Sequence, residues 1–322
     1  LAALALIVIT GFTAGSYPAL FLSSLKPVKV LKGALRFSRF ETWFRKGLTT
    51  FQFGLSILLL IATAVVSLQT DHIQNTNLGY DKDNLLYIRV EGELSKQESY
   101  QRFKDLASPL AGIAMVDRSS EAPHNMGFAM AEPFDWEGRP EGTYINFMPT
   151  SVGFDFLKIM DLEVVEGRGF SRDIATDSSD AFLVNEEAVR QMQMEEPLGK
   201  WVSAWSKKGK IIGILKDYHT HSLHEPIKPI MVDVKEYEEF GVILVRTKKG
   251  RTREAIENLE KVYATVNPSY PFNYQFIDQE YEALYKNEEV MSKLSNAFAI
   301  VAIMISCLGL LGLAMFSAEQ RF

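Results

Sequence analysis

The sequence predicts a multi-pass α-helical membrane protein that carries one large extracytoplasmic α+β domain. The first observation is that three long stretches have no charged side chain: 1–25, 47–68 and 294–318. The second is that residues 69–290 hold 38 of the 40 acidic and 25 of the 34 basic residues, a net charge of −13. The third is that this charged segment alternates strand-like and helix-like patterns, as a folded domain does.

Composition excludes several classes of protein. An apolar fraction of 47% excludes intrinsic disorder. The acidic balance of residues 69–290 argues against a nucleic-acid partner, which needs a basic face. Cys307 is the single cysteine, so no intrachain disulfide framework exists.

Each uncharged stretch is long enough to cross a membrane, because about 20 apolar residues in a helix span a hydrocarbon core of about 30 Å. We predict transmembrane helices over 1–25, 47–68 and 291–318, the last of which continues a stalk outside the membrane. Three buried helices of a soluble protein are the alternative, but such helices rarely exceed 20 residues without a charge.

The apolar stretch 1–25 differs from a cleaved signal peptide, because basic residues follow it instead of preceding it. We therefore expect the chain to be cut from a longer polypeptide. In that case residues 319–322 begin a truncated cytoplasmic segment.

The basic linker 26–46 sets the predicted orientation. It carries seven basic residues against one acidic residue, Glu41. Short loops rich in Lys and Arg stay in the cytoplasm, so residues 69–290 would lie in the periplasm of a cell inner membrane. An alternative role of the linker is to bind anionic lipid or a cytoplasmic partner.

The periplasmic segment reads as two strand–helix–strand units around an inserted lobe. The units would form one sheet with helices on one side, a split βαβ lobe. The inserted lobe, at about 125–230, is rich in Gly, Pro and short strands. The predicted elements are Asn84–Val90, Lys96–Leu106, Ile113–Ser119, Ala181–Val184, Gly199–Ala204, Lys210–Leu215, Gly241–Arg246, Thr252–Val266 and Tyr274–Ile277.

A stalk is predicted where the domain returns to the membrane. Tyr281, Leu284 and Tyr285 follow a helical spacing, and no Pro or Gly interrupts the pattern before Gly309. A single helix over 278–318 would span ~60 Å and could couple the domain to the membrane. The alternative is a break near Lys286 that leaves a flexible linker.

Motifs for catalysis are weak. The chain lacks a phosphate-binding loop, a G-x-S-x-G elbow and an H-E-x-x-H zinc motif. Asp217, His219 and His221, with His224 nearby, form an acceptable zinc set if the segment is extended. The alternative is that they are ordinary surface and turn residues, and we expect no catalytic, metal or cofactor site.

Small residues in the third span predict a contact between helices. Ser306, Gly309 and Gly312 are spaced at three, so they share roughly one helical face. Small side chains let two helix backbones approach closely in a membrane. We therefore expect this face of 291–318 to pack against another helix.

Several long motifs together resemble the Bacteroidota-type branch of the MacB/FtsX-like ABC transporter permeases, with a MacB-like periplasmic core domain. The motifs are Tyr17–Gly33, Phe44–Ser56, Leu78–Asn84, Phe154–Phe170, Gly213–Pro226, Asn267–Phe272 and Ile305–Arg321. The resemblance implies a non-catalytic membrane subunit that works by mechanotransmission. It also implies a cytoplasmic ABC ATPase partner, which binds MgATP, and a second permease copy or unit. In that arrangement 1–25 is the last span of the first permease unit.

The leading functional hypothesis is a permease that exports or extracts a substrate at the outer face. The alternatives are an FtsX-like regulator of a cell-wall hydrolase, a membrane receptor with a periplasmic sensor domain, and an extracytoplasmic enzyme. Membrane lipid and a periplasmic or outer-membrane protein are further expected partners. The sequence does not identify the cargo.

Overall fold

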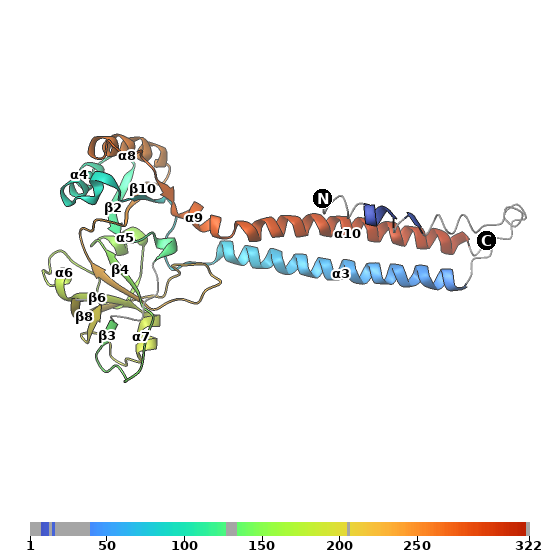
Figure 1. Ribbon diagram of the computed structural model, residues 1–322, viewed down its shortest axis with the longest axis horizontal. Helices are drawn as coiled ribbons and strands as arrows, with labels where there is room; N and C mark the ends of the chain where they lie inside the picture. Colours follow the sequence, from blue (N-terminus) through green and yellow to red (C-terminus); the bar gives the residue numbers. More distant parts are fainter. Residues whose placement is uncertain (1–7, 13–14, 17–38, 127–133, 205–206, 320–322) are drawn as a thin grey trace, which may run out of the picture. The chain divides into compact units, whose positions relative to one another are not determined.

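The computed structural model describes residues 8–12, 15–16, 39–126, 134–204 and 207–319 (Figure 1). The chain divides into two units, one of residues 1–66 with 293–322 and one of residues 67–292. Of the predicted first span, residues 8–12 and 15–16 are described and are helical. The remainder of that span, residues 26–38 of the linker, and 320–322 lie outside the described residues.

Two long helices contain the second and third predicted spans. They are α3 (Arg39–Asn75) and α10 (Lys286–Glu319). Within them, Lys46–Ile73 and Lys286–Gly312 are long and apolar enough to cross a membrane. Only 6% and 17% of their most apolar windows are buried inside the protein, whereas a core helix of a soluble protein is mostly buried. Helix α3 begins at Arg39, so the last residues of the predicted linker are already helical.

The split βαβ lobe is confirmed in the second unit. Its elements are β1 (Leu85–Arg89), η1 (Gly92–Ser95), α4 (Gln97–Ala107), β2 (Ile113–Ser119), β10 (Val242–Thr247), α8 (Thr252–Val266) and β11 (Gln275–Phe276). The strand order is β11-β1-β10-β2, and each neighbouring pair is antiparallel. Strand β10 thus lies between β1 and β2 of the first βαβ unit. Strand β1 in turn lies between β10 and β11 of the second unit, so the strands of the two units alternate in the sheet.

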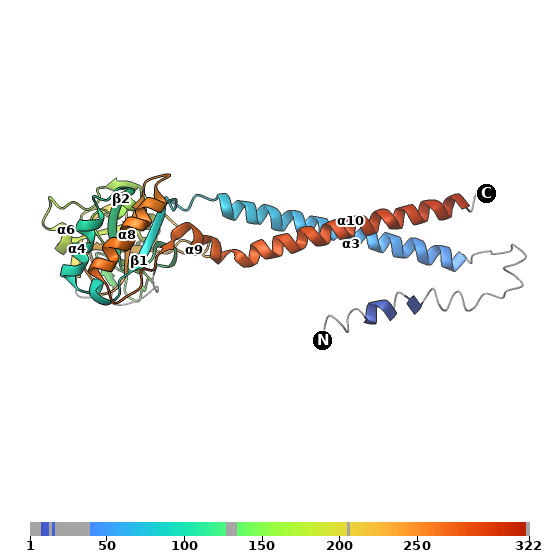
Figure 2. The ribbon, with the colours of Figure 1, turned by 90° about the horizontal axis from the view of Figure 1, so that it is seen from above.

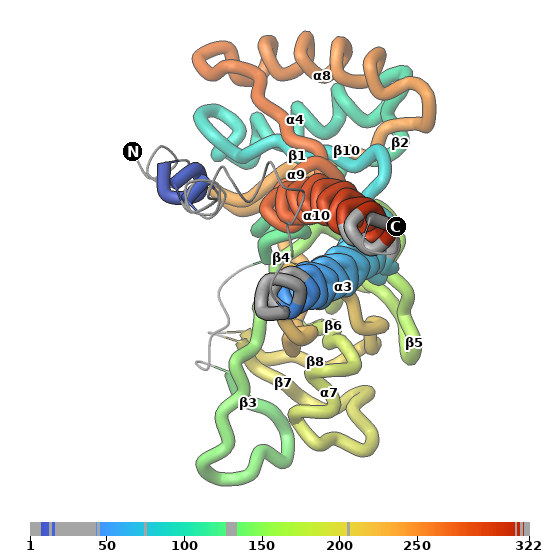
Figure 3. Tube along the Cα trace, turned by 90° about the vertical axis from the view of Figure 1, so that its right-hand side faces the viewer, coloured from blue at the N-terminus to red at the C-terminus, as the bar shows by residue number. Residues whose placement is uncertain are grey.

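Both helices of this lobe lie side by side on the same face of its sheet (Figures 1, 2 and 3). Successive side chains of a strand point to opposite faces. Leu86 and Ile88 of β1 therefore pack under α4 and α8, whereas Leu85 and Tyr87 enter a different cluster. A sheet buried on both faces explains the continuous apolar run of β1.

The inserted segment adds strands to the same sheet. The strand order continues β2-β4-β9-β6-β8-β7-β3, and β5 also pairs with β8. One residue pair, Ser119 with Val152, joins the two halves within the part of the chain that the structure describes. The strands predicted in this segment are confirmed as β6, β7 and β8. Its elements are η2 (Pro123–Asn125), β3 (Phe134–Trp136), β4 (Met148–Val152), α5 (Phe156–Met160), β5 (Val164–Gly167), α6 (Asp177–Asp180), β6 (Ala181–Asn185), α7 (Glu186–Met192), β7 (Trp201–Ala204), β8 (Lys207–Leu215) and β9 (Ile230–Val234).

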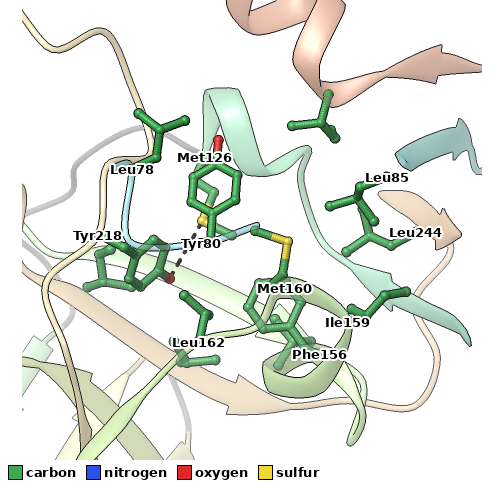
Figure 4. Packing of buried hydrophobic residues seen from close by; sticks show 14 of the residues in the cluster. Leu78, Tyr80, Leu85, Met126, Phe156, Ile159, Met160, Leu162, Tyr218 and Leu244 are labelled. Carbon is green, nitrogen blue, oxygen red and sulfur yellow. Dashed lines mark hydrogen bonds between the residues drawn. The ribbon is translucent and has the colours of Figure 1, made fainter. Parts of the chain in front are cut away.

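A central hydrophobic cluster connects the two halves of the domain (Figure 4). Leu85 and Leu244 enter it from the split βαβ lobe, and Phe156 and Met160 enter it from α5. The Tyr218 hydroxyl lies 3.9 Å from the Met126 sulfur inside this cluster. The predicted inserted lobe is therefore not separated from the rest, because its core side chains share one buried cluster with β1 and β10.

The prediction of one continuous stalk helix over 278–318 is wrong, because a single non-helical residue, Tyr285, separates two helices. Helix α9 (Ile277–Leu284) ends before Tyr285, and α10 begins at Lys286. Tyr285 has φ −110° and ψ 14°, which breaks the helix, yet the Glu289 N–H still donates to the Tyr285 carbonyl at 3.0 Å. The reason lies in the side chain: the break brings Tyr285 into the central cluster, whose packing prevails over helical continuity.

Candidate functional site

Two of the three predicted coupling residues anchor α9 in the domain. Tyr281 and Tyr285 are 4% and 7% exposed, and their ring centroids are 5.1 Å apart. The Leu223 N–H donates to the Tyr285 hydroxyl oxygen at 2.6 Å, which ties the end of α9 to the loop after β8. Leu284 is 44% exposed and lies on the outer side, so it does not belong to this anchor.

The domain end of α3 is buried in the same cluster. Ile73, in the last turn of α3, is 8% exposed and packs in the central cluster with Tyr281 and Tyr285. Both chain connections of the domain therefore end in one buried core. Because protein interiors are close-packed, a displacement at either connection must be accommodated by that core.

Two of the three residues of the predicted small-residue face, Ser306 and Gly309, lie against α3 within the unit of residues 1–66 and 293–322. The Ser306 and Ser56 hydroxyls lie 2.7 Å apart, and both residues are buried. A Cβ added at Gly309 would lie 3.1 Å from Gln52 Oε1. Gly312 has no atom within 4 Å of such a Cβ, so it is not part of the contact with α3.

Leucine at Gly309 is expected to weaken the contact between α3 and α10 by about 1–3 kcal/mol, the usual cost of overpacking. Leucine at Gly312 is the matched control, because it meets open space and replaces a poor helix former. The unfolding temperatures of the two purified variants in mild detergent would measure both effects. Equal midpoints for the two variants would show that Gly309 does not face α3.

The predicted metal residues are engaged with other groups. Asp217 Oδ1 accepts hydrogen bonds from the Asn185 side-chain amide at 2.8 Å and from the Glu187 N–H at 2.9 Å. His221 Nδ1 lies 3.0 Å from the Thr220 hydroxyl. The backbone N–H of His219 donates to the Leu78 carbonyl at 2.8 Å. The Nε2 atom of the His224 ring lies 3.5 Å from Glu288 Oε1. Within the described ranges, no group of three His, Cys, Asp or Glu is placed to hold a metal ion.

Three half-buried histidines make the domain sensitive to acid. Burial lowers the pKa of His124, His219 and His221 below the ordinary 6.5. The folded protein then binds fewer protons than the unfolded chain below that pH, so the free energy of unfolding falls as the pH decreases. The slope for each histidine is at most about 1.4 kcal/mol per pH unit.

His124 gives the clearest test of this effect. Its Nε2 lies 3.5 Å from Glu280 Oε2 on α9, with Arg89 and His221 as the other charged or titratable groups that act on it. Replacement by glutamine should flatten the decrease in unfolding temperature between about pH 7 and pH 5. Glutamine at the exposed His72 is the control and should leave the slope unchanged. An unchanged slope in His124→Gln would contradict the prediction.

Comparison with known families identifies the domain. The model of the MacB-like periplasmic core domain matches residues 52–261, from within α3 to within α8. The chain belongs to this family. The resemblance to MacB/FtsX-like ABC transporter permeases is thereby confirmed, and with it a periplasmic type of domain with an apolar helix before and after it in the sequence.

Solved structures with a similar fold include the periplasmic region of MacB from Actinobacillus actinomycetemcomitans. It is 14% identical, has a TM-score of 0.46, and the alignment covers 66% of this chain and 98% of that one. The extracellular domain of the noncanonic ABC-type transporter YknZ from Gram-positive bacteria is 14% identical, with a TM-score of 0.41 and coverages of 60% and 98%. A search of curated proteins gave no match.

The buried polar groups that hold the MacB-like domain together are not evident from the sequence pattern. Asp117 on β2 is fully buried, and its carboxylate accepts from Lys104 Nζ and from the Asp155 N–H, each at 2.9 Å. The neighbouring Arg118 is 1% exposed and donates to Glu238 at 2.9 Å. The one signal in the sequence was an Asp-Arg pair inside an otherwise apolar strand, where charges need partners.

Asn185 is a second such group. Its side-chain amide donates to Asp217 Oδ1 and to the Lys228 carbonyl, and its side-chain oxygen accepts from the Ala188 and Ile230 N–H groups. It caps the N-terminus of α7, a common position for Asn. Asp217 therefore completes a structural network in the MacB-like domain.

Proposed function

We propose that this chain is part of the permease subunit of an ATP-driven ABC transporter of the MacB type. In this proposal, a cytoplasmic ATPase hydrolyses MgATP, and the two membrane helices pass the resulting movement to the periplasmic domain. The domain itself carries no catalytic step. Family membership supports the class of protein, and one structural observation supports the mechanism.

That observation is the shared burial of Ile73, Tyr281 and Tyr285. Residues from the end of α3 and from α9 belong to the same buried cluster as side chains of β1 and β10, so a shift of either helix disturbs that packing. A flexible connection would instead let the helices move without displacing the domain. The anchoring therefore favours transmission of force over simple attachment.

Movement of α9 has two direct routes into the inserted part of the domain. The Tyr285 hydroxyl holds the Leu223 N–H in the loop between β8 and β9. Glu280, one turn earlier, pairs with His124 in η2 at 3.5 Å. A rotation or pull of α9 would displace both segments together, which is how the domain could bind and release a substrate or a periplasmic partner.

Purification of the full-length protein from membranes tests this proposal. The expected result is a co-purifying protein with a phosphate-binding loop and vanadate-sensitive MgATP hydrolysis, which disappears when that protein's loop lysine is substituted. A preparation stable in several detergents but without ATPase would contradict the proposal and favour a receptor. ATPase that activates a cell-wall hydrolase without export would instead identify an FtsX-like regulator.

A further inference from the structure

A cavity of about 350 Å³ lies at the base of the domain, between the end of α3, α9 and the start of α10. All of its lining residues belong to the unit of residues 67–292. The lining groups that matter here are Ile73, Lys82, Tyr281, Glu282, Glu288 and Glu289. Tyr285, whose hydroxyl oxygen accepts from the Leu223 N–H, also lines this cavity.

Two buried polar groups of this cavity have no hydrogen-bond partner within the described part of the chain. One is the hydroxyl of Tyr281, whose side chain is buried, and the other is Glu288 Oε2. Glu288 Oε1, by contrast, lies 3.5 Å from His224. Buried polar atoms are almost always satisfied, so these two atoms need partners from outside the described residues, which ordered water or a bound molecule can supply.

The two unpaired atoms need partners of opposite kinds, an acceptor for the Tyr281 hydroxyl and a donor for Glu288 Oε2. Burial raises the pKa of the Tyr281 hydroxyl, so it remains protonated and can donate to an anionic oxygen. Lys82 Nζ lies 4.7 Å from the centroid of the same ring and adds a positive charge beside it. Glu288 Oε2 can only accept, and therefore requires a donor such as an ammonium group.

The carboxylates suit an organic cation better than a metal ion. Glu282, Glu288 and Glu289 all line the cavity, yet within the described residues no three acidic or histidine side chains converge closely enough to hold a metal. An ammonium group on a larger molecule can contact carboxylates that are spread around a cavity of this size. Because Lys82 also lines the cavity, the lining matches a molecule that carries both charges.

Residues that line the cavity lie only a few positions from the predicted spans in the sequence. The uncharged stretch 47–68 spans about 33 Å as a helix, which is the thickness of the hydrocarbon core. Ile73 comes five residues after it, and Glu289 comes five residues before the uncharged stretch that begins at 294. These positions fall in the outer head-group layer, which is several ångströms thick.

We propose that this cavity binds a phosphoethanolamine group, the head group of a phosphatidylethanolamine lipid. The ammonium would contact Glu288, with Glu282 and Glu289 adding negative charge, and the phosphate would contact Lys82 and the Tyr281 hydroxyl. The site depends on the membrane placement of the two helices but not on the ATP-driven cycle. Its failure would therefore leave the ATPase experiment above unaffected.

Lipid retention by the full chain tests the site. The chain would be reconstituted in nanodiscs of equal phosphatidylethanolamine and phosphatidylglycerol, and the lipids that stay bound after extraction into detergent would be counted by native mass spectrometry. We expect a preference for phosphatidylethanolamine in the wild type. Glu288→Gln and Tyr281→Phe should each reduce retention about tenfold, the factor that ~1.4 kcal/mol represents.

The controls separate binding from folding. Tyr281→Phe keeps the buried ring in the central cluster, so thermal stability should fall little. Glu260→Gln, on the exposed face of α8, should retain lipid as the wild type does. Competition by free phosphoethanolamine would identify a soluble source of the same group, and its absence would identify the lipid. Equal retention of both lipids, or unchanged retention in both cavity variants, would overturn the proposal.

Discussion

Insertion of two glycines after Lys286 is expected to abolish the nucleotide-driven response of the periplasmic domain while ATP hydrolysis by the assembled complex persists. Helix α10 begins at Lys286, directly after the single-residue break at Tyr285. The insertion lengthens that break into a flexible joint, because glycine occupies a wide range of backbone conformations. A joint of this kind passes on neither torque nor displacement.

The response can be measured without knowledge of the cargo. Hydrogen exchange of residues 216–229 and 277–285 in the full-length complex, with and without MgATP and vanadate, reports whether α9 and its attached loop change. We expect at least a tenfold loss of the nucleotide-dependent difference. Insertion of two alanines at the same place is the matched control, because it rotates α10 by about 200° but keeps it helical.

The two insertions distinguish flexibility from register. If only the glycine variant loses the response, stiffness of the connection carries the signal. If both lose it, the rotational position of α10 relative to Tyr285 matters as well. An unchanged response in the glycine variant would contradict mechanical coupling through this helix.

Alanine at Asp117 is expected to lower the free energy of unfolding by about 3–5 kcal/mol, the usual cost of removing one partner from a buried ion pair. The carboxylate is fully buried, and its loss strands Lys104 Nζ, on a side chain only 12% exposed, and the Asp155 N–H. Gly153 packs against this carboxylate so closely that a Cβ there would overlap it.

Urea unfolding in mild detergent, followed by tryptophan fluorescence, would measure this change. Asp135→Ala is the control: Asp135 is 52% exposed, pairs with Arg139 at 3.6 Å, and should change stability by less than ~0.5 kcal/mol. Asp117→Leu combined with Lys104→Met should recover most of the loss, because no buried charge then remains unpaired. A loss below ~1 kcal/mol in Asp117→Ala would mean that water reaches the site.

The features that depend on short segments could be predicted without the structure. The spans follow from the length of the uncharged stretches 47–68 and 294–318. The elements β1, α4, β2, β10 and α8 lie within one or two residues of their predicted bounds, because periodic burial fixes them locally. The split βαβ lobe and the family could likewise be predicted from the sequence, since both depend on the order of segments along the chain.

Tertiary structure decided what depends on partners far apart in sequence. The pairing of Ser119 with Val152 joins the inserted strands to the first lobe in one sheet, although composition suggested a separate lobe. Tyr285 breaks the stalk helix because its ring packs in the central cluster, a contact that no local pattern encodes. Asp117 and Lys104 pair for the same reason: the energy of burying a charge depends on which group lies opposite, and folding alone determines that.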